Sequence, residues 1–458
     1  MSLNEKILEK YSVSIPRYTS YPTAPECKEI FTEQDFLTAN EKANKSKTPI
    51  SLYFHLPFCE SQCYFCACNI VISKKREVTE SYLKHIKKEI IRTSNHIDKT
   101  RKVEQIHLGG GTPTYFTPEE LTDFFSTVTK YFNISDDCET SIEIDPRVTT
   151  FEHIHTLKKI GFNRLSLGIQ DFNETVQESV NRIQPFELTK NIMDEAYKAG
   201  FISINTDLMY GLPYQSLETF KKTLELVLKL NPDRIALFHY AHLPQLLKHQ
   251  DKYISSSTLP DSSEKIKIFQ YAVNALTANG YVFIGLDHFA KPDDELSIAR
   301  RNKTLYRNFQ GYTTRAGCDL YGFGITAISN IQNTFSQNIK KLNPYYEAVD
   351  FDKIPIYRGV VLSKDDLLRK EIITKILCHG EIVIPAVEEK YDIDFNKYFA
   401  VEIEHLKELE KDGLILYTQY STLKVTPLGQ FFLRNIASGF DYYLNKKDGK
   451  QKVYSKSI

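Results

Sequence analysis

Hydrophobic and polar residues alternate along this chain in two patterns that follow one another in turn. From about residue 50, short runs rich in β-branched and aromatic residues predict strands, and the segments between them carry apolar residues at helical spacing. The predicted strands cover residues 51–56, 103–108, 141–144, 164–169, 204–209, 234–240 and 281–287. The predicted helices include residues 80–97, 118–132, 185–199, 217–230 and 263–279, and several follow a Ser, Thr or Asp able to cap them.

Strands that alternate with helices at this spacing form βαβ units, so we expect an α/β fold built on a mainly parallel sheet. Six or so repeats suit an open barrel, a closed barrel or a doubly wound sheet, and periodicity alone does not choose between them. In each architecture the active site lies at the C-terminal ends of the strands. Four noteworthy residues follow the first four predicted strands in turn: Cys59, Gly109, Asp145 and Gln170.

Both ends of the chain depart from this alternation. Residues 1–35 contain Pro16, Pro22 and Pro25 and predict an irregular N-terminal arm with one short helix, whereas residues 36–355 are expected to hold the barrel and its extension. Residues 356–445 resemble a winged-helix domain, with helices and strands expected at 364–377, 396–412, 414–418, 423–425 and 427–436. The lysine-rich residues 446–458 predict a solvated, mobile tail.

Length and charge exclude some functions. The chain has 458 residues and 41% hydrophobic content, which is enough to bury a large core. Lys plus Arg and Asp plus Glu each total 58, so the excess positive charge that supports binding along a nucleic-acid backbone is missing. The N-terminus lacks the apolar core of a signal peptide, and no run of about 18 apolar residues is present. We therefore expect a cytoplasmic protein that binds neither nucleic acid nor membrane.

Four of the eight cysteines fall within ten residues: Cys59, Cys63, Cys66 and Cys68. Thiolates suit zinc and iron–sulfur clusters, and such a group in a reducing compartment indicates metal chemistry before disulfides. A 4Fe–4S cluster that only transfers electrons takes four cysteines, whereas three leave one iron open to an external ligand. The alternative is structural zinc, with His55 nearby, although the separated C-x2-C pairs usual for zinc are missing. The x3–x2 triplet after a strand resembles the loop of radical S-adenosylmethionine (SAM) enzymes.

A longer resemblance covers almost the whole chain. The segment YFHLPFCESQCYFCACN at 53–69 resembles the oxygen-independent coproporphyrinogen III dehydrogenase family of heme biosynthesis. Further matching motifs are PRYTSYPT at 16–23, GGGTPT at 109–114, EIDP at 143–146, GIQDF at 168–172, DLMYGLP at 207–213, YAHLP at 240–244, DHFAKPDDEL at 287–296, NFQGYTT at 308–314 and RNI at 434–436.

The resemblance implies an open (β/α)6 radical SAM barrel with an N-terminal arm and a C-terminal, mainly helical domain. It implies one 4Fe–4S cluster and two SAM molecules in the barrel. The implied reaction is oxidative decarboxylation of two propionates of coproporphyrinogen III to vinyls, which gives protoporphyrinogen IX. In that reaction a deoxyadenosyl radical abstracts hydrogen from the propionate β-carbon. A flavodoxin or ferredoxin is the implied reductant, and the family suggests a monomer.

Site residues are carried over by matching motif. Cys59, Cys63 and Cys66 are expected to ligate the cluster, and Cys68 matches a fourth cysteine that is not a ligand. The expected SAM-binding residues are Tyr53, Phe65, Gly110, Gly111, Thr112, Glu143, Gln170, Arg182, Asp207, Ala241 and Ile328. The expected catalytic residues are Tyr53, His55, Glu143 and Gln310. By side-chain type alone, several of these would be interpreted as core residues, turn glycines or salt-bridge partners.

The chemistry of some side chains supports these assignments. Glycines let a ligand approach backbone N–H groups closely, and Glu143 is able to accept hydrogen bonds from a SAM amino group. The fork of Arg182 suits a carboxylate, and Asp207 is able to accept from a ribose hydroxyl. His55 in a strand is more often a satisfied core residue than a proton carrier.

Two further hypotheses remain open on the sequence. Arg17 and the tyrosines of the arm are expected to fold over the barrel mouth, where a lid would keep water from a radical. A heme-binding chaperone is the alternative function, because that sister group shares the cluster motif. It usually lacks the cysteine at the Cys68 position and the N-terminal arm, so both features favour the enzyme.

Overall fold

A computed structural model of the chain describes residues 5–445 and 454–456. Its centre is a parallel sheet in which six strands lie side by side in chain order. These strands are β1 (Ile50–Leu56), β4 (Lys102–Gly110), β5 (Asn133–Ile144), β6 (Arg164–Gln170), β7 (Ser203–Tyr210) and β8 (Arg234–His239). The prediction of an α/β fold built from βαβ units is confirmed, and the sheet stays open between its two edges.

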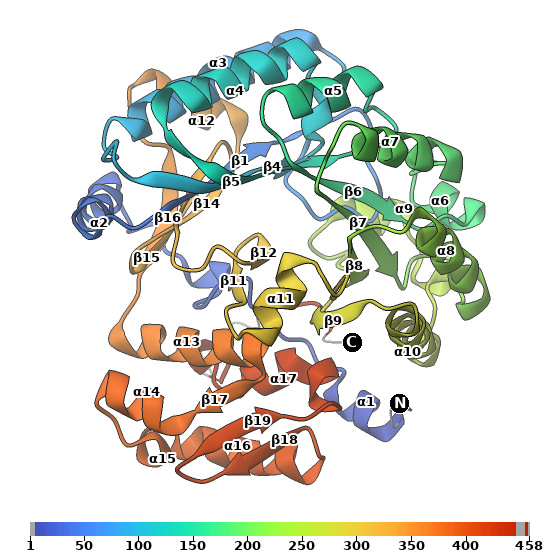
Figure 1. Cartoon of the computed structure of the whole chain (residues 1–458), viewed down its shortest axis with the longest axis vertical. Helices are drawn as coiled ribbons and strands as arrows, with labels where there is room; N and C mark the ends of the chain where they lie inside the picture. The colour runs from blue at the N-terminus through green and yellow to red at the C-terminus, as the bar shows by residue number, and fades with distance from the viewer. Residues whose placement is uncertain (1–4, 446–453, 457–458) are drawn as a thin grey trace.

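Helices cover the outer face of this sheet (Figure 1). They are α3 (Arg76–Ser94), α4 (Pro118–Tyr131), α5 (Phe151–Lys159), α7 (Phe186–Lys198), α8 (Leu217–Leu230) and α10 (Ser262–Ala278). Reciprocal caps begin three of them, because the side chains of Thr117, Thr150 and Ser216 each accept from the backbone three residues later. Apolar residues on their inner faces then form one core with the strands.

An antiparallel extension continues the sheet beyond β1. Strand β13 (Asp319–Phe323) pairs in parallel with β1, and β14 (Ile328–Ile331), β15 (Thr334–Asn338) and β16 (Ile356–Val361) follow as antiparallel neighbours. At the other edge, the predicted strand 281–287 is β9 (Val282–Gly285), which turns back through β10 (His288–Ala290). Strand β10 lies between β8 and β9 and runs antiparallel to both, so the predicted strand 281–287 does not pair with the six parallel strands. Periodicity does not encode strand direction.

Smaller elements connect these parts. A hairpin of β11 (Tyr306–Asn308) and β12 (Gly311–Thr313) lies between the barrel and the C-terminal helices (Figure 1). The short strands β2 (Phe58–Cys59) and β3 (Val71–Ile72) enclose the cysteine loop. The connecting and terminal helices are α2 (Glu33–Ser46), α6 (Glu174–Ser179), α9 (Lys248–Tyr253), α11 (Glu295–Arg301), α12 (Leu342–Asp350) and α18 (Tyr442–Asn445).

The C-terminal region has its own core and a three-stranded sheet in the order β17–β19–β18. Its elements are α13 (Lys364–His379), β17 (Glu381–Val383), α14 (Ile384–Tyr391), α15 (Phe395–Tyr398), α16 (Ala400–Lys411), β18 (Ile415–Thr418), β19 (Thr422–Val425) and α17 (Leu433–Ser438). Helices followed by a small β-ribbon match the order predicted from the sequence, and β17 and α14 are additional elements.

The N-terminal arm packs into this C-terminal core. Its helix α1 (Glu5–Tyr11) and the following segment bury Leu8, Tyr11, Tyr18 and Tyr21 against it. Arg17 reaches the barrel, where its Nη2 donates to the carbonyl of His239 over 2.9 Å. The arm therefore joins the end of β8 to the C-terminal region, and its role as a lid stays a prediction.

The predicted mobile tail is described only in part. Residues 446–453 and 457–458 lie outside the described residues. Lys456 forms an isolated antiparallel bridge with Ser14, and its carbonyl accepts from Arg434 over 2.9 Å. This part of the tail therefore contacts the arm. In the described ranges, no helix has the length and apolar character needed to cross a bilayer.

A buried ion pair attaches the extension to the barrel. The Arg101 Nη2 lies 2.7 Å from a carboxylate oxygen of Asp319, and both side chains are almost fully buried. The Nε and Nη1 of Arg101 donate to the Thr48 carbonyl and the Tyr321 hydroxyl, both over 2.8 Å. Removing one partner of such a pair leaves an uncompensated buried charge.

We therefore expect Arg101→Met to destabilise the protein by about 3–5 kcal/mol. The adjacent Lys102 has an exposed side chain, and Lys102→Met is the matched control with little expected effect. Denaturant unfolding followed by far-UV circular dichroism measures the difference. Equal midpoints for the two variants would contradict a stabilising role for this pair.

Candidate functional site

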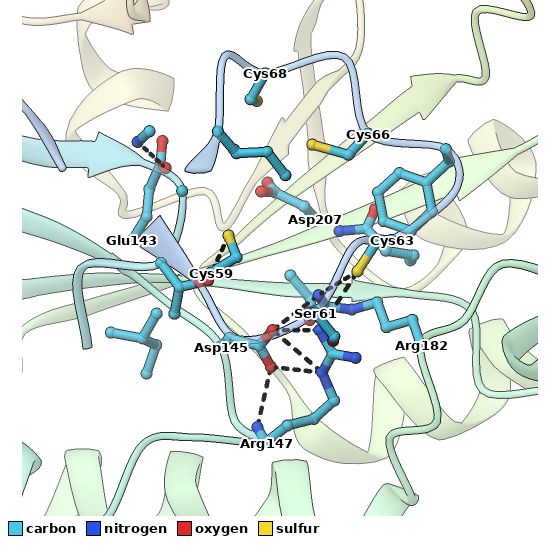
Figure 2. A pocket seen from close by; sticks show the side chains of 18 of the residues that line it. Cys59, Ser61, Cys63, Cys66, Cys68, Glu143, Asp145, Arg147, Arg182 and Asp207 are labelled. Atoms are coloured by element: carbon cyan, nitrogen blue, oxygen red, sulfur yellow. Dashed lines mark hydrogen bonds and ion pairs between the residues drawn. The ribbon is translucent and has the colours of Figure 1, made fainter. Parts of the chain in front are cut away.

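The four clustered cysteines line one cavity at the C-terminal ends of the parallel strands (Figure 2). We name it the cysteine cavity. Its other lining residues include Phe65, Gly110, Gly111, Thr112, Glu143, Asp145, Arg147, Gln170, Arg182 and Asp207. The cavity lies at the strand ends, where the active site is predicted, and most of the carried-over residues line it.

Contacts on both sides of the cysteine loop hold it in place. Its start and end pair in parallel as Phe58 with Val71 and Cys59 with Ile72. On the far side, the backbone N–H of Tyr64 donates to the carbonyl of Val180 over 3.0 Å. Because two separate elements bind this loop, the thiols are positioned before any ligand arrives.

The thiols differ in environment. Burial raises the pKa of Cys59 to about 12, whereas a hydrogen bond from Cys68 lowers the pKa of Cys66 to about 7. In the part of the chain that the structure describes, no three Cys, His, Asp or Glu side chains converge closely enough to hold a single metal ion. The thiols surround a cavity instead, which suits a polynuclear cluster.

The glycine segment packs closely against the start of the cysteine loop. The N–H of Gly110 donates to Glu143 over 3.1 Å, that of Gly111 to the Leu56 carbonyl over 2.9 Å and that of Thr112 to the Phe58 carbonyl over 2.8 Å. These three N–H groups therefore have partners within the chain, and the role of Gly110, Gly111 and Thr112 in SAM binding stays a prediction. A Cβ on Gly111 would lie 2.5 Å from the Pro57 carbonyl carbon, so a larger residue would displace the cysteine loop.

Glu143 interacts with a histidine and not with the arginine that a core carboxylate would need. Its Oε1 lies 3.3 Å from His107 Nε2, and His107 Nδ1 lies 2.6 Å from the Ser141 hydroxyl. Burial opposes its ionisation, but the His107 hydrogen bond and charge lower the pKa of Glu143 below its ordinary value. An ionised acceptor at this edge suits a cationic amino group.

Tyr53 and His55 form a connected pair beneath the cysteine loop. The Tyr53 hydroxyl lies 3.0 Å from His55 Nδ1, and His55 Nε2 lies 3.0 Å from the carbonyl of Asn69. Burial lowers the pKa of His55, so the neutral ring donates to that carbonyl and accepts from the tyrosine. His55 thereby orients the segment after Cys68 and is not free to move a proton in this arrangement.

A carboxylate between two guanidinium groups was not assigned from the sequence. Asp145 Oδ2 lies 2.7 Å from Arg147 Nη2 and 3.0 Å from Arg182 Nη1, and both arginines also lie within 3.7 Å of the Cys63 sulfur (Figure 2). Burial opposes ionisation, but Arg182 and Arg147 lower the pKa of Asp145 to about 2. Its position directly after the third predicted strand was the one sequence feature that indicated a place in the site.

Gln170 and Asp207 line the same cavity, and a buried polar atom of Gln170 lacks a partner in the described chain. Gln170 has a positive φ of 68° and a buried Oε1 without a partner among the described residues. Asp207 accepts from Asn205 over 2.8 Å, and burial together with Glu143 raises its pKa to about 7. Backbone strain and an orphaned acceptor at one cavity indicate a site prepared for a polar ligand.

Besides Tyr53 and His55, three carried-over residues lie outside this cavity. Gln310 lines a second cavity inside the barrel, where its Nε2 is buried and unpartnered within the described chain. The Ala241 carbonyl and that of Phe65 both accept from Gln250 Nε2, which ties the cysteine loop to the end of β8. Ile328 packs with Phe335 and Leu362 in a small core and is not brought to the cysteine cavity.

These features fit an iron–sulfur cluster with a polar ligand beside it. Three thiols of one loop face a shared cavity, two cations offset the charge of thiolates, and the opposite wall offers unpaired polar atoms. Thiolate ligands suit iron–sulfur clusters, and the cavity leaves room for a second molecule.

Comparison with known proteins defines first a class and then a family. The radical SAM superfamily model matches residues 53–227, which run from β1 through most of α8. Over its full length the chain is 47% identical to the oxygen-independent coproporphyrinogen III oxidase of Synechocystis sp., which it covers to 98%. The Escherichia coli protein of the same name is 42% identical over 97% of this chain and 96% of its own.

A solved structure agrees over the same range. Coproporphyrinogen III oxidase from Escherichia coli superposes with a TM-score of 0.92 and 42% identity, covering 96% of this chain and 99% of that one. The chain therefore belongs to the oxygen-independent coproporphyrinogen III oxidase family of radical SAM enzymes. The family resemblance inferred from the motifs is confirmed.

The raised pKa of Asp207 predicts a pH effect on the ligand-free protein. The folded chain keeps a proton on Asp207 up to about pH 7, whereas an exposed carboxyl releases it near pH 4. Between these values the folded state binds more protons than the unfolded state, so this residue makes stability fall as pH rises.

Asp207→Asn removes this titration. We expect the variant to gain on the order of 2 kcal/mol over the unaltered chain at about pH 8 and little at about pH 4. Thermal unfolding across that range measures the difference, with the exposed Asp251→Asn as control. A gain that does not change with pH would contradict the assignment.

Proposed function

We propose that this chain converts coproporphyrinogen III to protoporphyrinogen IX by oxidative decarboxylation of two propionates to vinyls. The observation that carries the proposal is the cysteine cavity, whose residues match the family motifs in a chain related to the named oxidases over its full length. Further support comes from a polar cavity inside the barrel that shares Glu143, Ser166 and Asp207 with it.

The residues that would hold the cofactors follow from the geometry. Cys59, Cys63 and Cys66 would ligate the cluster, with Arg147 and Arg182 beside the Cys63 sulfur. Glu143 would accept from the amino group of SAM. When bound, the reduced cluster and SAM supply the radical that removes hydrogen from the propionate β-carbon. The chain's own contribution is to orient these groups and to exclude water.

Two SAM molecules are part of the proposal. Glu143 and Gly110 offer one set of contacts, and Gln170 and Asp207 offer another on the opposite wall, where the orphaned Gln170 oxygen needs a donor. Gln310 and the Tyr53–His55 pair would act on the substrate or on the position of the loop. A flavodoxin or ferredoxin as reductant, a monomeric state and a cytoplasmic location complete the proposal.

The direct test is an anaerobic assay of reconstituted protein with SAM, a reductant, an electron acceptor and coproporphyrinogen III. We expect protoporphyrinogen IX, detected after oxidation as protoporphyrin by chromatography, together with cleaved SAM. Stoichiometric heme binding without vinyl product would instead favour the heme chaperone.

Serine substitutions test the cluster ligands separately from turnover. Cys59→Ser, Cys63→Ser and Cys66→Ser are each expected to lose most of the bound iron and the brown colour, because serine is a poor ligand for iron–sulfur clusters. Cys68 lies in the same loop, and the Cys68→Ser variant is expected to keep the bound iron. Iron and sulfide content per chain is the readout. Equal iron loss in all four variants would overturn the three-ligand assignment.

A further inference from the structure

A second group of cations lies away from the cysteines, where the arm, the β11–β12 hairpin and α13 meet. We name the cavity at this junction the cationic pocket. Its lining includes Tyr18, Ser20, Arg307, Asn330, Phe335 and Lys370. These residues come from four separate parts of the chain, so only the folded protein assembles the pocket.

The pocket contains positive charge without a counter-charge. Arg307 and Lys370 both line it, and no Asp or Glu is among its lining residues. Two other buried cations, Arg101 and Arg369, are each paired with a carboxylate, that of Asp319 and that of Glu402. Unpaired buried cations are costly unless a ligand compensates them.

The donors of Arg307 are oriented but unused. Its Nε and Nη1 are buried and have no hydrogen-bond partner within the described ranges. The guanidinium lies over the ring of Tyr312 at 5.0 Å, and the Tyr312 hydroxyl donates to the Leu377 carbonyl over 2.8 Å. The contact with the ring helps to hold the guanidinium in place, and its unpartnered donors are available to an anion.

Lys370 is held in a similar way. Its Nζ lies 4.9 Å from the centre of the Phe335 ring, and it forms no ion pair with any residue that the structure describes. Burial lowers the pKa of Lys370 to about 8, so the ammonium form still predominates at neutral pH. A carboxylate would pair with both cations and restore their lost solvation.

The cationic pocket adjoins the cavity proposed for the substrate. Asn308 lines both the pocket and the barrel cavity, and the next residues of the hairpin divide between them, Phe309 on the pocket side and Gln310 on the barrel side. The barrel cavity in turn shares Glu143 and Asp207 with the cysteine cavity. A large ligand in the barrel is therefore flanked by the cysteines at one end and by the cations at the other.

We propose that the cationic pocket binds a propionate of the porphyrinogen that does not react, through Arg307 and Lys370. The inference rests on the proposed function, because that substrate carries four propionates and only two become vinyls. A reacting propionate must face the cysteine cavity, so a non-reacting one is free to take a fixed charge contact. That contact would set which side chains of the macrocycle reach the cofactors.

Binding measurements test the pocket without turnover. Coproporphyrin III, the stable oxidised form of the macrocycle, would be titrated into Arg307→Gln, Lys370→Met and the unaltered full-length chain by fluorescence. Each substitution is expected to weaken binding by about tenfold, as for loss of one charge-assisted contact. Coproporphyrin III tetraamide keeps the ring and lacks the charges, so it should bind the unaltered chain more weakly than coproporphyrin III does. Its affinity should be the same for all three proteins.

The matched control is Lys364→Met, which removes an exposed lysine from the same helix outside the pocket. It should bind both ligands as the unaltered chain does, and Arg307→Lys should recover part of the lost affinity. Unchanged affinity for coproporphyrin III in both pocket variants would overturn the proposal. Equal loss for both ligands would also overturn it, because shape and not charge would then explain the effect.

Turnover separates this inference from the proposed function. In an active chain, Arg307→Gln and Lys370→Met should raise the KM for coproporphyrinogen III by about the same factor, with a smaller effect on kcat. Absence of vinyl product from the unaltered chain would refute the proposed function. An active chain whose variants keep the original KM would refute only the role of the cationic pocket.

Discussion

The site depends on one close backbone contact, in which the chain leaving β4 lies directly against the chain leaving β1. Gly111 and Thr112 donate to the carbonyls of Leu56 and Phe58, and the first thiol follows at Cys59. Only glycine fits at position 111, because any Cβ there would overlap the backbone of Pro57. The thiols are therefore positioned by two neighbouring strands of the sheet rather than by the loop itself.

Charge is arranged differently at the two ends of the connected cavities. Near the cysteines, Asp145 is shared by Arg147 and Arg182, so one carboxylate offsets part of the charge of these two cations. In the cationic pocket, Arg307 and Lys370 have no such partner within the described residues. A polycarboxylate is attracted most strongly where cations are unpaired. This distribution would draw the anionic groups of a substrate away from the cofactors, so that a reacting side chain reaches them through position rather than charge.

Local signals explain why much of the fold and site could be predicted from the sequence. Strand–helix alternation marks the six parallel strands, and residues at strand ends gather because parallel strands share one edge. The insertion of β10 between β8 and β9 and the addition of β13 to β16 could not be predicted, because strand pairing depends on contacts between distant segments. The hydrogen bonds of the glycine N–H groups could not be predicted for the same reason. Whether Gly110 N–H is free depends on Glu143, which lies in another strand.

The N-terminal arm and the C-terminal region lie at opposite ends of the sequence, but they pack together in one core. Tyr18 and Tyr21 belong to the core that contains Leu377, and Arg434 donates through Nε to the Pro16 carbonyl over 3.1 Å and through Nη2 to the Ile15 carbonyl. These contacts hold Arg17 against the end of β8 and place Tyr18 and Ser20 in the wall of the cationic pocket. The C-terminal region therefore has a structural role that needs no excess positive charge. It joins the arm and α13 in one core beside the barrel.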